Sequence, residues 1–363
     1  MRNVRAVFLG GSDPIRFMDG DVPAPPPDGL TVRVQLAGVC GTDAHRLSGE
    51  LPASAPVGFG HEGVGVVEEL GDGKQLDWAG RPLTVGDRVY WFPPAGCGEC
   101  YQCRIQQDIG TCDNFQWPPP ADEPNSAAYQ EVATLGSNVA VFRIPQDTPS
   151  EAVIAFGCAL PTALGAFRRL GRIGPGSTIV VQGSGPVGLA STLLAAMSPA
   201  SRVITIGSGK ERLGAAARLG ASDVLDIEQL SADERQAVVL DLTSGRGADI
   251  VLESAGVLAA FDEGMAMLAK NATYVIQGLY AGSGTVSLDP FRLNNRSQRI
   301  IGSLGGNPED ILGAVTLATR LHASLGLSDL VTHRFALRDL GRAIESMRHE
   351  STIKPVVEPA ATA

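Results

Sequence analysis

The cysteines of this chain fall into two patterns that suit metal binding. Four of the six lie close together with short spacings: Cys97-x2-Cys100-x2-Cys103-x8-Cys112. The other two, Cys40 and Cys158, lie on either side of His61 in the sequence. Structural zinc is held by four protein ligands, whereas catalytic zinc keeps one position open. The sequence therefore predicts one closed metal site with four thiolate ligands and one open metal site with Cys, His and Cys ligands.

A glycine-rich turn follows a predicted buried strand at 177–182 and opens a predicted helix that runs to residue 196. It reads Gly183-Ser184-Gly185-Pro186-Val187-Gly188. In this context the first glycine permits the tight turn, the second lets a pyrophosphate approach the backbone, and the third lets the helix pack on the strand. Free N–H groups at the helix start can bind the phosphates. We therefore expect a Rossmann dinucleotide site; the alternative is a glycine-rich loop without a ligand.

The next strand, expected at 202–206, ends at the position that discriminates NAD from NADP. An NAD site usually has an acidic residue there, which binds the ribose hydroxyls. Here the residue is Gly207, which cannot repel a 2′-phosphate. The residues that can supply donors and positive charge nearby are Ser208, Lys210 and Arg212. We therefore predict NADP, with NAD as the alternative if the two cations only form a solvated helical turn, and we expect Gly207→Asp to reverse the preference.

Two kinds of segment surround these motifs, and 363 residues suit about two domains. Up to about residue 158, short runs bounded by Gly, Pro and Asp predict a β-rich region. Beyond it, apolar strands alternate with helices, which favours a parallel sheet covered on both faces. Further strands are expected at 249–252, 273–277, 331–335 and 353–357, and further helices at 210–219, 258–268, 308–321 and 338–347.

Charge and composition exclude several classes of function. Asp and Glu outnumber Lys and Arg, 39 to 29, so the net charge is −10. Such an acidic chain is a poor ligand for nucleic acid, where affinity comes largely from phosphate neutralisation, and anionic membranes would repel it. No apolar run of about 18 residues could span a bilayer, and no secretory segment begins the chain. Tight Cys-x2-Cys spacing without an export signal favours metal over disulfides, so we expect a cytoplasmic protein.

These motifs, in this order, resemble the zinc-dependent medium-chain alcohol dehydrogenases. Further segments add to the resemblance, which covers nearly the whole chain: Gly38–His45, Gly60-His61-Glu62, Glu253-Ser254-Ala255-Gly256 and Ile353–Val357. It implies an α/β protein with a GroES-like β-rich catalytic domain (1–159 and 304–363). A Rossmann domain with a doubly wound parallel sheet (160–303) interrupts it, and the active site is expected in the cleft between them.

The resemblance also implies the metal ligands, residue by residue. Cys40, His61 and Cys158 would hold a catalytic zinc, and Cys97, Cys100, Cys103 and Cys112 a structural one, giving two zinc ions per chain. The last cysteine spacing is one residue longer than the family usually shows, so we expect the loop 104–111 to bulge by one residue.

The same resemblance implies roles for other residues near these ligands. Thr42 and His45 would relay the substrate proton through the cofactor ribose to water. Asp43 would orient His61 and fix its tautomer, and Glu62 would act as a second-layer or transient metal contact. Candidates for lining the substrate pocket, which core packing explains equally well, are Trp91, Phe92, Trp117, Leu160 and Tyr280.

The resulting prediction is a zinc-dependent oxidoreductase that transfers hydride between a small-molecule alcohol and NADP or NAD, interconverting the alcohol and its ketone or aldehyde. The alcohol is expected to be secondary, a polyol or a cyclitol, and the protein a homo-oligomer, dimer or tetramer. A polyol- or threonine-dehydrogenase-like member of the same superfamily is one alternative; a non-enzymatic zinc-binding structural or interaction protein is another. A zinc-free quinone reductase on this fold would lack the metal ligands present here.

Overall fold

The structure is a computed structural model that describes residues 2–51, 56–92, 96–115, 117–121, 125–282, 284–349 and 351–360. The chain divides into two compact units. One comprises Met1–Cys158 and Gly306–Ala363 and is here called the β-rich unit; the other, Ala159–Gly305, is the α/β unit.

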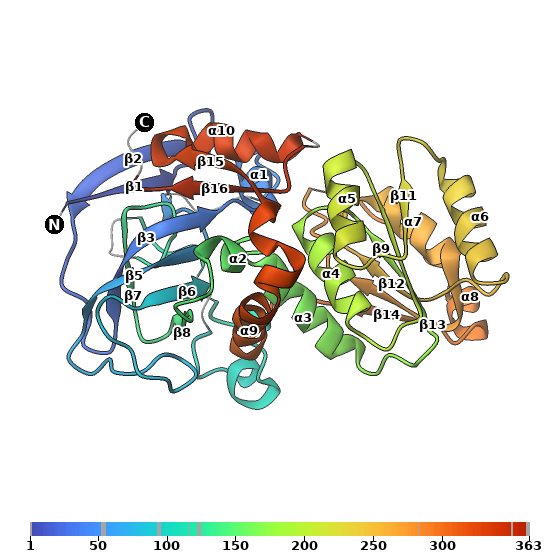
Figure 1. Cartoon of the computed structure of the whole chain (residues 1–363), viewed down its shortest axis with the longest axis horizontal. Helices are drawn as coiled ribbons and strands as arrows, with labels where there is room; N and C mark the ends of the chain where they lie inside the picture. Colours follow the sequence, from blue (N-terminus) through green and yellow to red (C-terminus); the bar gives the residue numbers. More distant parts are fainter. Residues whose placement is uncertain are drawn as a thin grey trace. The chain divides into compact units, whose positions relative to one another are not determined.

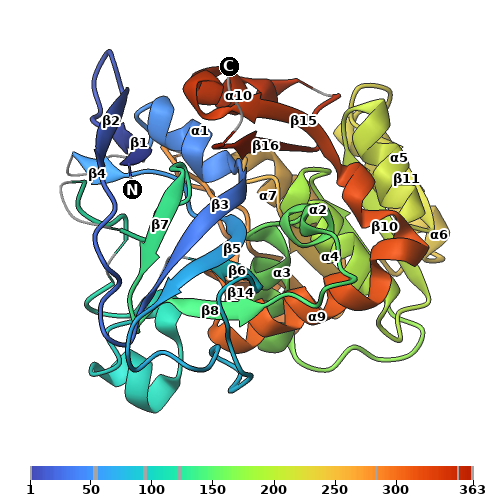
Figure 2. The ribbon, with the colours of Figure 1, turned by 60° about the vertical axis from the view of Figure 1, so that its left-hand side comes forward.

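The β-rich unit is built on two sheets (Figures 1 and 2). The larger has the order β15-β16-β3-β5-β6-β8, with β7 pairing to β3, and the smaller has the order β2-β1-β4. Their strands are β1 (Arg2–Phe8), β2 (Ile15–Asp21), β3 (Leu30–Gly38), β4 (Val57–Gly58), β5 (Gly63–Leu70), β6 (Arg88–Phe92), β7 (Val132–Leu135), β8 (Ala140–Arg143), β15 (Val331–Ala336) and β16 (Lys354–Glu358). The helices are α1 (Gly41–Leu47), α2 (Ser150–Ile154), α9 (Pro308–Leu325) and α10 (Leu340–Glu345).

Both faces of the larger sheet are buried. Along β6, Val89 and Trp91 pack into one apolar cluster, whereas Tyr90 and Phe92 pack into another. Successive side chains of a strand point to opposite faces, so two clusters on alternate residues mean two covered faces. Helix α10 packs on β15 and β16, and α9 packs on α2 and β8 (Figure 2). This packing fixes the loops that lead into the metal-binding residues.

The α/β unit contains a six-stranded parallel sheet with the order β11-β10-β9-β12-β13-β14 (Figure 1). Its strands are β9 (Thr178–Gln182), β10 (Arg202–Gly207), β11 (Asp223–Asp226), β12 (Ala248–Glu253), β13 (Leu268–Ile276) and β14 (Arg299–Gly302). Its helices are α3 (Ala159–Leu170), α4 (Pro186–Ala196), α5 (Lys210–Arg218), α6 (Ala232–Leu242), α7 (Leu258–Met267) and α8 (Pro290–Asn295). Counted from β9, this is the doubly wound order 3-2-1-4-5-6 of the Rossmann fold.

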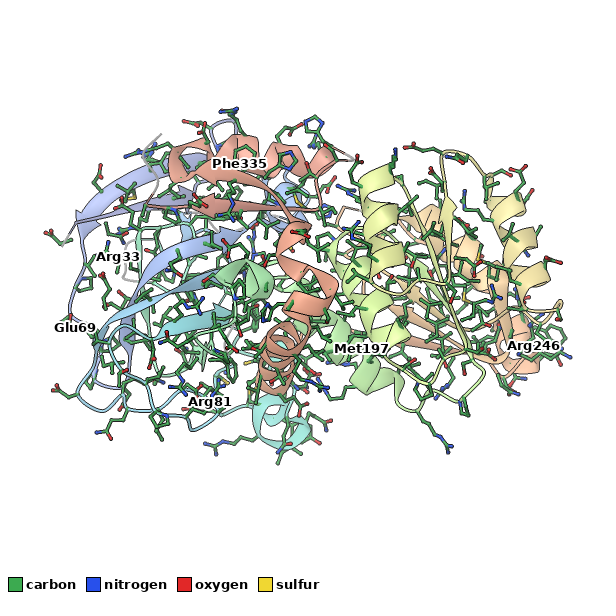
Figure 3. All side chains as sticks on the ribbon, in the orientation of Figure 1. Arg33, Glu69, Arg81, Met197, Arg246 and Phe335 are labelled. Carbon is green, nitrogen blue, oxygen red and sulfur yellow. The ribbon has the colours of Figure 1, made fainter. Side chains whose placement is uncertain are left out.

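This sheet is also covered on both faces. Ile179 and Val181 of β9 join a cluster with residues of α3 and α4, whereas Val180 joins one with residues of α6 and α7. The continuous apolar strands noted in the sequence are therefore buried by helices on either side. Charged side chains such as Arg81 and Arg246 lie on the exposed loops of the two units (Figure 3).

The expected elements are present, with shifted boundaries. Helix α9 extends to Leu325, where Gly326 in the left-handed region (φ 58°) ends it. The expected helix 338–347 is instead a 3₁₀ turn, the short α10 and a second 3₁₀ turn. Among the described residues, no helix has both the length and the apolar character needed to cross a bilayer.

Candidate metal and cofactor sites

Cys40, His61 and Cys158 come together in the β-rich unit, although 118 positions separate the two cysteines in the sequence. Cys40 immediately precedes α1, His61 lies between β4 and β5, and Cys158 follows α2. Their ligand atoms and a carboxylate oxygen of Glu62 all lie within 4.8 Å of one another. The two sulfurs are 3.4 Å apart and unbonded. Two thiolates and one imidazole, with a fourth position left for substrate, form a donor set that suits zinc.

The electrostatics of the Cys40 and Cys158 thiols also fit a cation. A hydrogen bond from the Cys158 thiol holds the pKa of Cys40 well below its usual range, while the same shared proton and burial raise the pKa of Cys158. In this arrangement one sulfur keeps its proton because two adjacent buried negative charges repel each other. A bound divalent cation would offset this repulsion, so that both cysteines could bind it as thiolates.

Asp43 lies beside His61. The buried carboxylate lies 3.5 Å from His61 Nδ1, measured at Oδ1. Its Oδ2 accepts hydrogen bonds from the Cys40 backbone N–H (3.0 Å) and the Tyr129 hydroxyl (2.7 Å). Such a partner fixes the tautomer and leaves Nε2 for a metal ion. Tyr129 was not predicted from the sequence, because 86 positions separate it from Asp43.

Glu62 has a buried partner, Lys354, that the sequence analysis also missed. Their side chains are 0% and 1% exposed and form an ion pair. Lys354 Nζ also donates to Val39 O (3.0 Å), and the other Glu62 oxygen accepts from the Cys158 backbone N–H (2.9 Å). The pair therefore ties β16 to the loop that carries Cys158. The sequence feature that could have revealed this partner is a lysine within the apolar run Ile353–Val357.

Two glycines make room for the Glu62 carboxylate. A Cβ added to Gly38 would lie 1.9 Å from Oε2, and one added to Gly157 would lie 2.0 Å from the same atom. Gly157 is also in the left-handed region, with φ 49°. Neither position can carry a side chain while the carboxylate stays where it is, so the backbone around Cys158 is shaped to the Glu62–Lys354 pair.

Thr42 and His45 both lie on α1, three residues apart and hence on one side of the helix. The Thr42 hydroxyl oxygen is 3.6 Å from Cys40 Sγ. His45 is partly exposed, and its Nδ1 is 2.5 Å from Glu50 Oε2. The structure thus places Thr42 beside a candidate ligand and His45 at the solvent, paired with a carboxylate.

The residues expected to line a substrate pocket differ in whether they lie beside His61 or within the core. The rings of Phe92 and Trp117 each lie edge-on to His61, with centroids 6.1 Å away. Trp91 is fully buried in the core, with Nε1 donating to Ser126 O (2.9 Å). Leu160 is likewise buried, in α3.

The four clustered cysteines form the second candidate metal site, with all four sulfurs within 4.8 Å of one another. Backbone N–H groups of Glu99 and Cys100 point at Cys97 Sγ (3.5 and 3.4 Å) and lower the pKa of that thiol to about 6. The Cys97 N–H points at Cys112 Sγ (3.3 Å). Amides directed at sulfur stabilise thiolates, which are the form that binds zinc.

The segment between Cys103 and Cys112 contains a wide helical turn. Gln102–Gln106 form a π-helix, which holds more residues per turn than an α-helix, and Gln107 follows in the left-handed region (φ 54°). The buried Asn307, which precedes α9, then fastens this segment: its Nδ2 donates to Gln107 O (2.7 Å), and its Oδ1 accepts from Ile109 N–H (3.0 Å). The longer loop is therefore compatible with four converging sulfurs.

Replacing Cys103 by serine is expected to release one zinc ion per chain and to lower the melting temperature. A hydroxyl is a poor zinc ligand at neutral pH, and structural zinc contributes folding energy directly. Elemental analysis with a thermal melt measures both effects. Ser324→Ala, on the exposed side of α9, is the matched control and should keep the metal content of the wild type. Unchanged zinc content in Cys103→Ser would count against the closed site.

The glycine-rich turn lies between β9 and α4, as expected. Gly183 has φ 110°, a Cβ on Gly188 would lie 1.8 Å from Gly183 O, and a Cβ on Gly185 would meet nothing within 4 Å. The turn therefore leaves no space for a side chain at Gly188, whereas the space beside Gly185 is free. Pro186 and Val187 begin α4, whose first N–H groups have no partner within the helix. This open cradle fits the pyrophosphate of a dinucleotide.

The end of β10 lies beside this turn. Gly207 is buried in the strand, Ser208 is half-buried, and α5 starts at Lys210, which is exposed. Arg212 follows in the first turn of α5 and is partly exposed. The three polar residues proposed for a 2′-phosphate thus follow the end of β10 closely along the chain, and acidic Glu211 lies in the same first turn of α5.

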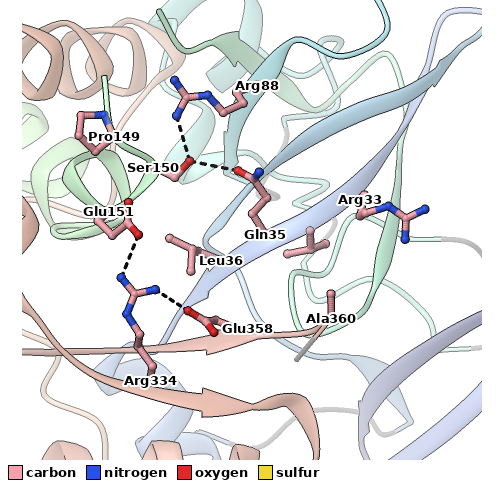
Figure 4. Close-up of a pocket in the computed structure, with 11 residues that line it drawn as sticks. Arg33, Gln35, Leu36, Arg88, Pro149, Ser150, Glu151, Arg334, Glu358 and Ala360 are labelled. Carbon is pink, nitrogen blue, oxygen red and sulfur yellow. Dashed lines mark hydrogen bonds and ion pairs between the residues drawn. The ribbon is translucent and has the colours of Figure 1, made fainter. Parts of the chain in front are cut away.

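A hollow of about 580 Å³ in the β-rich unit has no predicted site residue in its wall (Figure 4). In its wall Arg334 forms ion pairs with Glu151 (2.8 Å) and Glu358, and Arg88 donates to the Ser150 hydroxyl (3.2 Å). The hollow does not include any of the metal or cofactor residues described above.

Comparison with known proteins is consistent with this geometry. The zinc-binding dehydrogenase family matches residues 186–320, and the alcohol dehydrogenase GroES-like domain matches residues 26–146. A curated relative, 5-exo-hydroxycamphor dehydrogenase from Pseudomonas putida, is 38% identical over 99% of both chains. The chain belongs to the zinc-dependent medium-chain alcohol dehydrogenase family.

Solved structures agree with the family assignment. An alcohol dehydrogenase from Thermotoga maritima is 28% identical, with TM-score 0.91 and 99% of each chain covered. A protein from Sinorhizobium meliloti 1021, described as a zinc-binding dehydrogenase and solved with NADP, is 26% identical, with TM-score 0.84, covering 99% of this chain and 100% of its own. The expected fold class and enzyme class are confirmed: this dehydrogenase is an α/β oxidoreductase with GroES-like and Rossmann parts.

Proposed function

We propose that this enzyme interconverts a secondary alcohol and its ketone, using zinc at Cys40, His61 and Cys158 and a nicotinamide dinucleotide at the glycine-rich turn. The observation that carries the proposal is the convergence of two thiols and an imidazole around one point. The relative from Pseudomonas putida, a 5-exo-hydroxycamphor dehydrogenase, supports a bulky, apolar secondary alcohol. The Phe92 and Trp117 rings beside His61 offer an apolar surface for such a substrate.

Zinc, when bound, supplies a Lewis acid that lowers the pKa of a hydroxyl, and the nicotinamide accepts the hydride. This chain's residues then position and move the proton. Thr42, whose hydroxyl lies beside Cys40, would accept this proton while passing its own hydroxyl proton on through the cofactor ribose to His45, three residues further along α1, which would release a proton to water. Asp43 keeps His61 oriented, and Glu62 holds the Cys158 backbone in place.

The finer assignments are part of the same proposal. Two zinc ions per chain are supported by the two converging ligand groups. A preference for NADP is supported by Gly207, Ser208, Lys210 and Arg212 around the end of β10. A catalytic domain of residues 1–159 and 304–363 around a cofactor domain of 160–303 is supported by the two compact units. The homo-oligomer and the cytoplasmic location stay predictions; light scattering on purified protein tests the first.

A panel of secondary alcohols, polyols and ketones tested with both cofactors checks this function. We expect kcat/KM to be highest for bulky, apolar secondary alcohols and higher with NADP than with NAD. The polyols and threonine report on the alternative membership of a polyol- or threonine-dehydrogenase branch. Turnover of polyols alone, or no turnover of any alcohol by the zinc-loaded protein, would contradict the proposal.

A further inference from the structure

We infer that Tyr129, a buried residue shortly before β7, is a positioning residue for the open metal site. Its hydroxyl holds Asp43 against His61 and thereby sets how tightly that site binds zinc. This inference deepens the proposed function and rests on the zinc ion proposed there. Tyr129 belongs to none of the motifs found in the sequence, and its side chain is 0% exposed.

The Tyr129 hydroxyl is one of two donors that orient the Asp43 carboxylate. Oδ2 accepts from this hydroxyl (2.7 Å) and from the Cys40 backbone N–H (3.0 Å), which leaves Oδ1 facing His61 Nδ1 at 3.5 Å. The hydroxyl oxygen is also 3.1 Å from Gly38 O, but a hydroxyl has one proton, and the shorter contact with a charged acceptor takes it. Asp43 is 1% exposed, so bulk solvent cannot replace a lost donor.

The backbone fixes Tyr129 relative to the segment that carries His61. Tyr129 N–H donates to Phe59 O (3.0 Å), and Ala128 N–H donates to Gly60 O (2.9 Å), so the two segments are paired directly before the histidine. The tyrosine ring lies against Gly60, where an added Cβ would be 2.7 Å from ring atoms Cγ and Cδ2. No side chain at 60 could share this space with the ring. Tyr129 therefore contacts the His61 segment with its backbone and ring, and α1 with its hydroxyl.

Packing in the core accounts for the Tyr129 ring but not for its hydroxyl. The ring packs edge-on against Phe59, with centroids 5.3 Å apart, within an apolar cluster of the β-rich unit. A phenylalanine would make the same contacts without bringing a polar group into the core. What the hydroxyl adds is its bond to Asp43. Loss of a group that orients a metal-binding histidine lowers metal affinity by about 10- to 100-fold, so we expect the hydroxyl to act on zinc binding.

The test titrates the zinc-loaded protein with a chelator and follows the zinc released from each site. Cys40→Ala and Cys103→Ser, which each remove one site, assign the two release steps. Tyr129→Phe should weaken zinc binding at the open site by about 10- to 100-fold and leave the four-cysteine site unchanged. Tyr274→Phe is the matched control: it removes the hydroxyl of an equally buried tyrosine, bonded to Gln182 Oε1 (3.2 Å) in the α/β unit, and should leave both sites at wild-type affinity.

An Asp43→Ala background shows whether Tyr129 acts through Asp43. There, Tyr129→Phe should not weaken zinc binding further, because the hydroxyl no longer has its carboxylate partner. The inference is overturned if Tyr129→Phe holds open-site zinc as wild type does, if it weakens both sites alike, or if its effect persists in full without Asp43. Should Asp43→Ala fail to fold, the comparison of Tyr129→Phe with Tyr274→Phe decides alone. Wild type with an empty open site would overturn both proposals, whereas open-site zinc without alcohol turnover would contradict only the proposed function.

Discussion

Cys40→Ala is expected to reduce alcohol turnover to background while the protein keeps its fold and one zinc ion per chain. The proposed open site would have three protein ligands, and removing one would leave an imidazole and a single thiolate, too few to retain zinc against competing water. The four-cysteine cluster does not involve Cys40 and should remain filled. Steady-state kinetics, elemental analysis and circular dichroism on one preparation measure all three quantities.

Thr42→Ala serves as the control for this substitution. It lies two residues away on α1 and removes a proton acceptor, not a ligand. It should keep both zinc ions and lower kcat by about 10²- to 10⁴-fold, the usual scale for a lost proton-transfer group. Wild-type kcat in Cys40→Ala would refute the open zinc site; wild-type kcat in Thr42→Ala would remove only the proton relay.

Lys354→Met is expected to lower the free energy of unfolding by about 3–5 kcal/mol, the range for breaking a buried ion pair on one side. The substitution leaves the Glu62 carboxylate buried without a countercharge, because both side chains are inaccessible to solvent. Guanidinium unfolding at fixed zinc concentration measures the change.

The double variant Glu62→Gln/Lys354→Met isolates the electrostatic part of that loss. An amide can still accept the Cys158 backbone N–H, and it carries no charge that needs a partner. Most of the lost stability should return. If Lys354→Met unfolds at the wild-type midpoint, or if the double variant is no better than the single one, the ion pair does not stabilise this fold.

The family resemblance supplied the distant set Cys40, His61 and Cys158, but the parts of the site that local sequence patterns predicted are those whose residues lie close together along the chain. The spacing of Cys97 to Cys112 and the Gly183–Gly188 turn carry their geometry locally, since each is formed by one loop. Strand–helix alternation predicted the parallel sheet for the same reason: apolar runs and turn residues are local signals.

The missed residues are those defined by contacts between distant segments. Lys354 lies 292 positions from Glu62, and Tyr129 lies 86 from Asp43. Nothing in a local pattern shows which buried carboxylate a lysine will pair with, because the pairing depends on β16 joining β3 in the sheet.

The central claim is that alcohol oxidation depends on zinc at Cys40, His61 and Cys158. The most direct test is alcohol-dependent reduction of NADP or NAD by wild-type protein verified as metal-free, before and after zinc is added back. We predict no turnover without zinc, and recovery as zinc fills the open site in addition to the four-cysteine site. Full turnover by the metal-free protein would contradict the account.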